Sequence, residues 1–206
     1  MNDLNRALSD ITSIRRQVAR ATEFRGYGPA TLAATGVFAA LAAAVQALVL
    51  PRPAEHILNY LDIWVSTAIV SAGLIAVQTV TRAHRMHSGM ADEMLRTAVE
   101  QFLPSAAAGA LLTFVLVRFA ASSVWMLPGL WQVTFGLGVF ASCRFLPRPM
   151  VAAGVWYLTA GLVCISLADD RALSPWTMGI AYGGGQLLVA GVLYFASPED
   201  RSEEQA

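Results

Sequence analysis

Six long runs without a charged residue or a histidine dominate the pattern of polar and apolar positions. Each run is close to or above the roughly 17–25 residues that an α-helix needs to cross the hydrocarbon of a bilayer. The alternating polarity of membrane β-strands is absent from them. The pattern therefore predicts an all-α, polytopic membrane helix bundle within residues 29–197. We expect six transmembrane helices at about 29–50, 62–82, 102–119, 123–144, 150–168 and 176–196.

The stretch from residue 122 to residue 150 contains the fourth run and the arginines that follow it. Trp125 and Trp131 stand near its beginning, and Arg144 and Arg148 stand at its end. Aromatic residues at one membrane interface and arginines at the other are typical of a helix that crosses a bilayer.

The residues before the first run predict an amphipathic cytoplasmic helix over 1–28. An apolar stripe recurs there at helical spacing, and its arginine borders suit an anionic membrane surface. The helix could lie on the inner leaflet, fold back on the protein's own loops, or pair with a second copy. Its stripe is the candidate partner interface and consists of Leu4, Ala7, Leu8, Ile11, Ile14 and Val18. Residues 198–206 are expected to form a polar cytoplasmic tail.

Composition and charge agree with a membrane protein. The chain is 56% hydrophobic and only 14% charged, which is unlike the balance of a soluble domain. It contains no lysine, and most of its arginines precede the first run or separate the second from the third and the fourth from the fifth. The positive-inside rule then places both termini in the cytoplasm. The formal net charge of zero gives no reason to expect nucleic-acid binding.

A glycine triplet in the sixth run is the first candidate binding element. Gly183, Gly184 and Gly185 are followed by Gln186, and Gln132 is a polar residue in the fourth run. Close packing against a neighbouring helix is the first interpretation of the triplet. The alternative is a locally unwound helix at a ligand-binding site, with the two glutamines as ligand contacts.

A weaker candidate is a metal site after the second run. His84 and His87 lie three residues apart, and Asp92 follows, so two imidazoles and a carboxylate could bind zinc or iron. Histidines beside arginines at a membrane edge more often contact lipid headgroups. We expect no cofactor.

The two halves of the chain share three short similarities in the same order. Residues 36–39, 71–77 and 109–112 resemble residues 138–141, 159–165 and 185–188. A duplication of three helices would place the halves upside down relative to each other, as in many transporters. Chance matches between runs rich in alanine, glycine and leucine are the alternative explanation.

Three segments carry a resemblance to a known group of proteins. FLPSAAAGALLT (102–113), PGLWQVTFGLGV (128–139) and AYGGGQ (181–186) resemble segments of uncharacterised six-helix bacterial inner-membrane proteins. The resemblance covers the third to the sixth run. It implies six helices and a bacterial inner membrane, and it brings no known activity.

The predicted function follows from what the runs lack. Proton-coupled transport and intramembrane catalysis generally need ionisable groups at depth, whereas polar groups such as Gln46 and Gln132 can only join helices or line a neutral path. We expect no enzyme activity, but a membrane scaffold, sensor or accessory subunit in the lipid bilayer, with a homo-oligomer or a membrane or cytoplasmic protein as partner. The alternative is a small transporter or channel for a neutral or lipid-like solute, built on an inverted repeat. A third hypothesis is an interfacial enzyme that uses the two histidines and Asp92.

Overall fold

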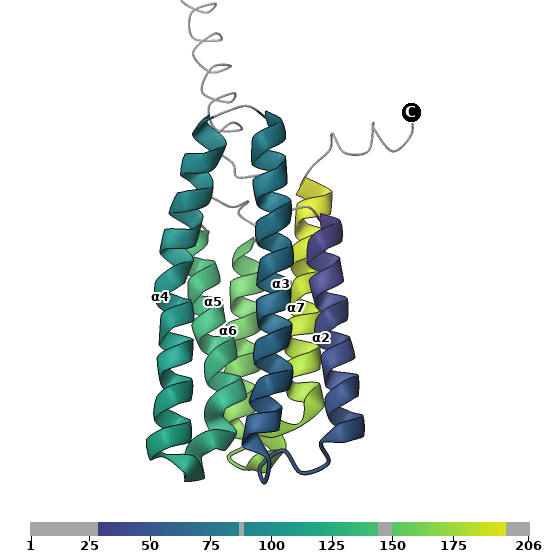
Figure 1. Ribbon diagram of the computed structural model, residues 1–206, viewed down its shortest axis with the longest axis vertical. Helices are drawn as coiled ribbons and strands as arrows, with labels where there is room; N and C mark the ends of the chain where they lie inside the picture. Colours follow the sequence, from purple (N-terminus) through teal and green to yellow (C-terminus); the bar gives the residue numbers. More distant parts are fainter. Residues whose placement is uncertain (1–28, 87–88, 144–149, 197–206) are drawn as a thin grey trace, which may run out of the picture.

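The computed structural model of the protein describes residues 29–86, 89–143 and 150–196, without the side chains of residues 79, 82–99 and 196. This part of the chain is helical and contains no strand (Figure 1). Its elements are α2 (Pro29–Val49), α3 (Ile57–Met86), α4 (Gly89–Phe119), the short 3-10 helix η1 (Ala121–Met126), α5 (Leu127–Ser142), α6 (Met150–Ser166), the short 3-10 helix η2 (Asp170–Leu173) and α7 (Pro175–Ala196). The prediction of an all-α bundle is confirmed.

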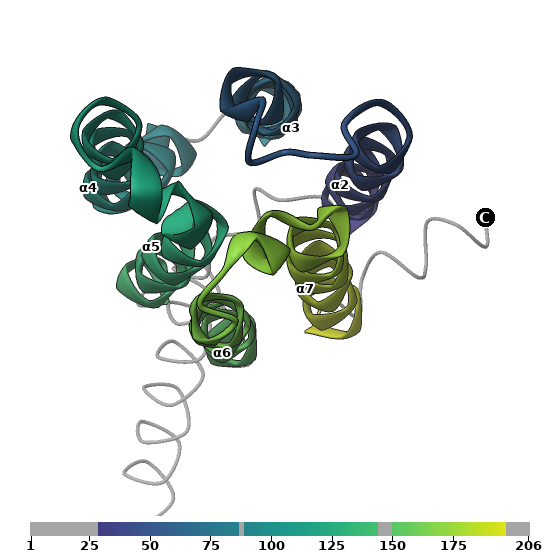
Figure 2. The ribbon, with the colours of Figure 1, turned by 90° about the horizontal axis from the view of Figure 1, so that it is seen from below.

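The α-helices of the described part run up and down and close a ring. Each contacts the next one along the chain, and α7 returns to contact α2 (Figure 2). The beginning of α2 and the end of α7 lie at the same end of the bundle (Figure 1). The α2–α3 connection, η1 and η2 lie at the opposite end, which we call the η end.

The order of helices in the ring bears on the predicted repeat. An inverted repeat would relate α2, α3 and α4 to α5, α6 and α7 by a two-fold axis in the membrane plane. Such an axis reverses the direction in which successive helices follow one another round the ring. Here α5, α6 and α7 continue round the ring in the same direction as α2, α3 and α4 (Figure 2). The arrangement of the described helices therefore does not support a 3+3 inverted repeat.

Five helical segments are long and apolar enough to cross a membrane. They are Pro29–Val49, Ile57–Gln78, Glu100–Phe119, Ala121–Ser142 and Pro175–Phe195. The fifth predicted span corresponds to α6, which is apolar but has 17 residues and ends at Ser166 rather than at residue 168. The fourth span joins η1 to α5, with Pro128 in the first turn of α5, where a missing N–H leaves no intrahelical bond unmade.

Two helices are longer than the sequence predicted. α3 begins at Ile57 and continues to Met86, and α4 begins at Gly89, well before residue 102. The added residues include charges, but arginine, glutamate, methionine and alanine all favour helix, so leaving the apolar run does not end the helix. Pro104 consequently lies inside α4 and not in its first turn. Its lost N–H removes one backbone hydrogen bond there.

Glycines hold two helix pairs at very short distance. A Cβ atom on Gly129 of α5 would lie 2.7 Å from the carbonyl oxygen of Gly161 on α6, and a Cβ atom on Gly161 would lie 2.6 Å from that of Gly129. Between α2 and α7, a Cβ atom on Gly36 would lie 3.1 Å from the carbonyl oxygen of Gly183. Such backbone contact is how small residues drive helix association where lipid is as apolar as the side chains.

The interior contains two apolar clusters. The first, toward the η end, includes Tyr60, Trp64, Leu173 and Met178. The second, toward the other end, includes Leu32, Val139, Met150, Ala153 and Leu193.

Candidate functional site

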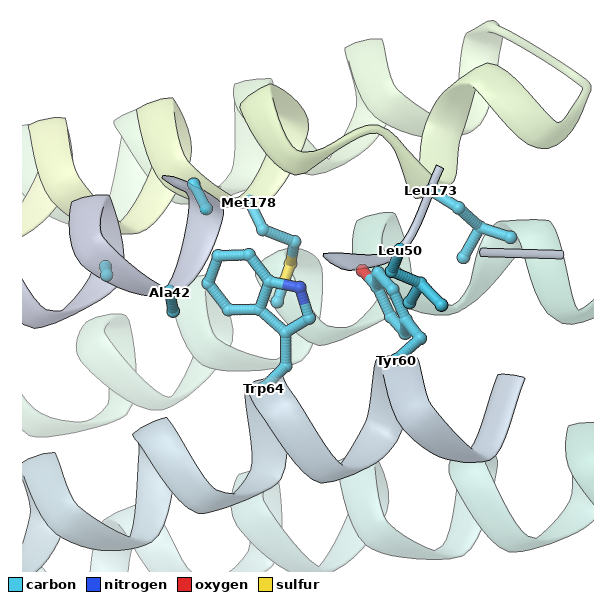
Figure 3. Close-up of a cluster of buried hydrophobic side chains, with 8 residues drawn as sticks. Ala42, Leu50, Tyr60, Trp64, Leu173 and Met178 are labelled. Carbon is cyan, nitrogen blue, oxygen red and sulfur yellow. The ribbon is translucent and has the colours of Figure 1, made fainter. Parts of the chain in front are cut away.

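Gln46 ties three elements together in the first cluster. Gln46 has no exposed surface. The indole N–H of Trp64 on α3 donates to Gln46 Oε1 at 2.7 Å, and Gln46 Nε2 donates to the carbonyl oxygen of Leu173 in η2, also at 2.7 Å. Trp64 and Tyr60 project from α3 toward Met178 and Leu173 (Figure 3). Every side-chain polar atom of Gln46 thus has a buried partner, and the residue serves packing and not ligand binding.

The segment before α7 is anchored inside the η end. Ala172 and Leu173 are buried. The Ala172 carbonyl oxygen accepts hydrogen bonds from the Thr177 hydroxyl at 2.7 Å and from the Cys164 thiol at 3.6 Å. These two hydrogen bonds fix the buried end of η2 to α6 and to the first turn of α7.

An exposed ion pair orders the start of this segment. Arg171 donates from its backbone N–H and from Nε to the carboxylate of Asp169, with Nε and Oδ2 2.7 Å apart. The hydrogen bonds from Arg171 hold the pKa of the Asp169 carboxyl below its ordinary value. The same contact raises the pKa of the Arg171 guanidinium.

Aromatic rings fill the centre of the bundle. Phe135 of α5, Tyr157 of α6 and Tyr182 of α7 have ring centroids 4.7–5.5 Å apart. On the η side, Tyr60 of α3 stacks on Trp131 of α5 at 6.5 Å. These distances are typical of favourable aromatic pairs.

Several polar oxygens in this interior have no hydrogen-bond partner within the described protein. Tyr60 Oη, Gln132 Oε1 and Tyr157 Oη belong to residues with no exposed surface. Gln132 Nε2, by contrast, donates to the carbonyl oxygen of Thr177 at 3.1 Å and lies 3.8 Å from Met178 Sδ. Gln186 Oε1 is also buried without a partner.

The glycine triplet has a packing role in this structure. A Cβ atom on Gly183 would lie 3.5 Å from the backbone of α2, and one on Gly184 would lie 3.1 Å from the Trp156 ring. A Cβ atom on Gly185 would collide with the Tyr157 hydroxyl. α7 is a continuous α-helix across the triplet, so the structure shows no unwound segment there.

The structure separates the two predicted ligand-binding glutamines. Gln132 lies beside Thr177 of α7. Gln186 follows Thr177 by nine positions on the same helix, which is roughly 13 Å at about 1.5 Å per residue. The interior oxygens of Tyr60 and Tyr157 were not among the predicted site residues. Tyr157 lies in an apolar run, where a tyrosine looks the same whether it faces lipid or the interior, and Tyr60 lies before the second predicted span, so the sequence offered no signal for either.

The remaining predicted sites fall outside the described part. The side chains of His84 and Asp92 and the whole of His87 are not described, nor is the apolar stripe of Leu4, Ala7, Leu8, Ile11, Ile14 and Val18. Within the described ranges, no group of three or more His, Cys, Asp or Glu side chains could hold a metal ion.

The fold and the interior define a class, an all-helical bundle whose apolar helices can cross a membrane. Comparisons with known protein families, with curated proteins and with solved structures found no match to this chain.

Proposed function

We propose that the protein is a non-catalytic membrane module of a bacterial inner membrane, acting as a scaffold or accessory subunit through its α3–α4 hairpin. The observation that carries this proposal is how little of α3 and α4 the bundle covers. Only 11% of the apolar window of α3 and 6% of that of α4 are buried, against 39–44% for α2, η1–α5 and α7. Helices with so little packing in the monomer have most of their surface free for another protein.

The free faces of this hairpin have the composition of helix-docking surfaces. Ala72 and Ala76 on α3 are exposed and four residues apart, with Gly73 beside them. Ala106 and Ala110 repeat this small-xxx-small spacing on the exposed face of α4. Such spacing lets a second transmembrane helix approach closely, and close packing is the main source of helix association in lipid.

The hairpin also extends beyond the membrane. At about 1.5 Å per residue, α3 and α4 are each roughly 45 Å long, against a hydrocarbon thickness of about 30 Å. Their apolar segments end at Gln78 and begin at Glu100, so the excess lies at the end of the bundle where α2 begins and α7 ends. This extension carries Arg82, Arg85 and Arg96, which places it in the cytoplasm by the positive-inside rule.

Site-specific photo-crosslinking in cell membranes tests the proposal. A photoreactive amino acid at Ala72 or Ala106 should give a discrete crosslinked protein band, while the same residue at the exposed Ala44 of α2 should give none. Ala76→Leu should abolish the crosslink from position 72 because it fills the same small-residue face of α3, and Ala44→Leu should leave it unchanged. The bundle should stay folded in both, since neither side chain packs inside it.

Two results would contradict the proposal. One is equal labelling from α2 and α4, which would mean that the hairpin is simply lipid-facing. The other is a flux of neutral solute through proteoliposomes that Gly184→Leu abolishes while assembly is retained, which would favour the transporter hypothesis instead.

A further inference from the structure

The buried anchors of α3 lie near the beginning of the helix. Tyr60 and Trp64 are buried there. The Trp64 indole donates to Gln46 of α2, and the Tyr60 ring stacks on Trp131 of α5. Of the described side chains at residues 65–81, by contrast, none is buried. We call the part before residue 65 the anchored end of α3 and residues 65–81 its arm.

The other helix of the hairpin, α4, is attached to α5 at two heights. The ring of Phe102 packs edge-on against Phe135 of α5, with the ring centroids 5.3 Å apart. The Thr113 hydroxyl accepts a hydrogen bond from the Trp131 indole at 2.8 Å. Phe102 and Thr113 are eleven residues apart, which is roughly 16 Å along α4 at about 1.5 Å per residue. These contacts fix α4 along the bundle, whereas the buried contacts of α3 hold only its anchored end.

A weak point in α3 lies directly after the anchored end. The hydroxyls of Ser66 and Thr67 both donate to the carbonyl oxygen of Ile63, at 3.1 and 2.7 Å. Hydroxyls that bond to carbonyl oxygens of the preceding turn compete with the backbone hydrogen bonds of the helix and often bend it. Two such hydroxyls on one carbonyl oxygen form a hinge between the anchored end and the arm.

Moving the arm costs little in a bilayer. Ile75 of the arm is partly buried and packs against the second apolar cluster. Lipid tails are as apolar as this cluster, so uncovering it to lipid loses packing contacts but no hydrophobic stabilisation. The arm leads into the extension of α4, and Pro104, which donates no backbone hydrogen bond, gives α4 a weak point where that extension ends. The connection between the two helices can therefore follow the motion.

We propose that the arm of α3 swings about the hinge at Ser66 and Thr67, so that the seam between α3 and α4 opens and closes toward the lipid. In the closed state, Ile75 holds the arm on the bundle. A bend of about 20°, the size of a distinct helix kink, moves residue 77, eleven residues beyond Ser66, by roughly 6 Å at about 1.5 Å per residue. The motion goes beyond the scaffold function and needs no partner protein, so either proposal can fail alone.

Double electron–electron resonance on the full chain in lipid nanodiscs tests the hinge, because it measures the distribution of distances between two spin labels. The background is Cys143→Ser, in which the buried Cys164 stays unlabelled. One label of each pair is on α6, which lies across the ring from α3 (Figure 2). The labelled positions are all exposed and form an arm pair, an anchored pair and a reference pair on α2: Val77→Cys with Val155→Cys, Leu58→Cys with Leu162→Cys, and Val37→Cys with Val155→Cys.

The three pairs should give different distance distributions. The arm pair should show a main peak and a second population at distances longer by roughly 6 Å, the displacement expected for a bend of about 20°. The anchored pair and the reference pair should each give one narrow peak, because the elements that carry these labels do not move relative to one another.

Two changes with matched controls identify the hinge and the contact that closes it. Ser66→Ala combined with Thr67→Val removes both hydroxyls and should leave the arm pair with one narrow peak. Thr81→Val removes a hydroxyl that bonds to its own helix beyond the label, and it should change nothing. Ile75→Ala should increase the population at longer distances. Ile69→Ala makes the same change on the exposed face and should not.

The proposal is overturned if the wild-type arm pair gives a peak as narrow as that of the reference pair. It is also overturned if the anchored pair broadens as much as the arm pair, because α3 would then move as a whole. A third contrary result is an unchanged second population in the protein with Ser66→Ala and Thr67→Val. A narrow reference pair in every variant shows that the bundle stays folded.

Discussion

At the scale of the residue, two buried glutamines differ in how many of their amide atoms have hydrogen-bond partners. Gln46 has partners for both ends of its amide, the Trp64 indole and the Leu173 carbonyl. Gln132 has a partner for its nitrogen but none for its oxygen. A fully paired amide in a low-dielectric interior fixes its neighbours, whereas a half-paired one is a place where a ligand or water can bind.

Replacing Gln46 tests the first role. Gln46→Leu leaves the Trp64 N–H and the Leu173 carbonyl buried without partners, at about 1–3 kcal/mol per unpaired group. We expect the free energy of unfolding in detergent micelles to fall by at least about 1 kcal/mol, measured by denaturant titration. Adding Trp64→Phe should cost less in the Gln46→Leu background than in the wild type, because the indole N–H is already unpaired there. Strictly additive losses would show that the hydrogen bond contributes nothing.

At the scale of the element, glycines decide which helices can touch. Gly129 and Gly161 allow the backbones of α5 and α6 to meet, and Gly36 and Gly183 do so for α2 and α7. Gly73 on α3 has nothing within 4 Å of an added Cβ atom. Two closely packed pairs follow from these glycines, whereas α3 is more loosely attached to its neighbours.

The same substitution at two of these glycines should have opposite effects. Gly161→Ala would place a methyl group 2.6 Å from the Gly129 carbonyl oxygen and 2.8 Å from Val133 Cγ2. This overpacking should lower the free energy of unfolding by about 1–3 kcal/mol. Gly73→Ala meets no atom, so better helix propensity should leave stability unchanged or raise it by up to about 1 kcal/mol. Thermal unfolding of both variants in the same lipid checks the pair, and a stable Gly161→Ala protein would disprove the tight α5–α6 contact.

At the scale of the whole molecule, the positions of the arginines in the sequence and the fold both distinguish the same two ends of the bundle. Arg52 in the α2–α3 connection and Arg171 in η2 both lie at the η end. Their side chains are 74% and 73% exposed, so both are accessible from that side. Most other arginines belong to segments connected at the opposite end.

Cysteine labelling checks the orientation that this division predicts. In a Cys143→Ser background, Arg52→Cys and Arg171→Cys should react with a membrane-impermeant maleimide in intact spheroplasts. Arg201→Cys should react only after lysis, because the positive-inside rule places it in the cytoplasm. The native Cys164 is buried and should stay unlabelled, which provides an internal control. Labelling of Arg201→Cys before lysis would show that the orientation is the opposite of the predicted one.

The sequence by itself determined the class of the fold and the approximate position of each helix. A bilayer tolerates only long apolar segments whose backbone bonds are satisfied within the segment, so run length predicts helices directly. It also singled out Gln132, because a glutamine in an uncharged run is conspicuous. The tertiary structure alone decided that the helices form a serial ring, that α3 and α4 extend beyond their apolar runs, and that Tyr60 and Tyr157 face inward. Alanine, glycine and leucine fit many helix pairings equally well, so the choice among them depends on atomic packing that no run of residues displays.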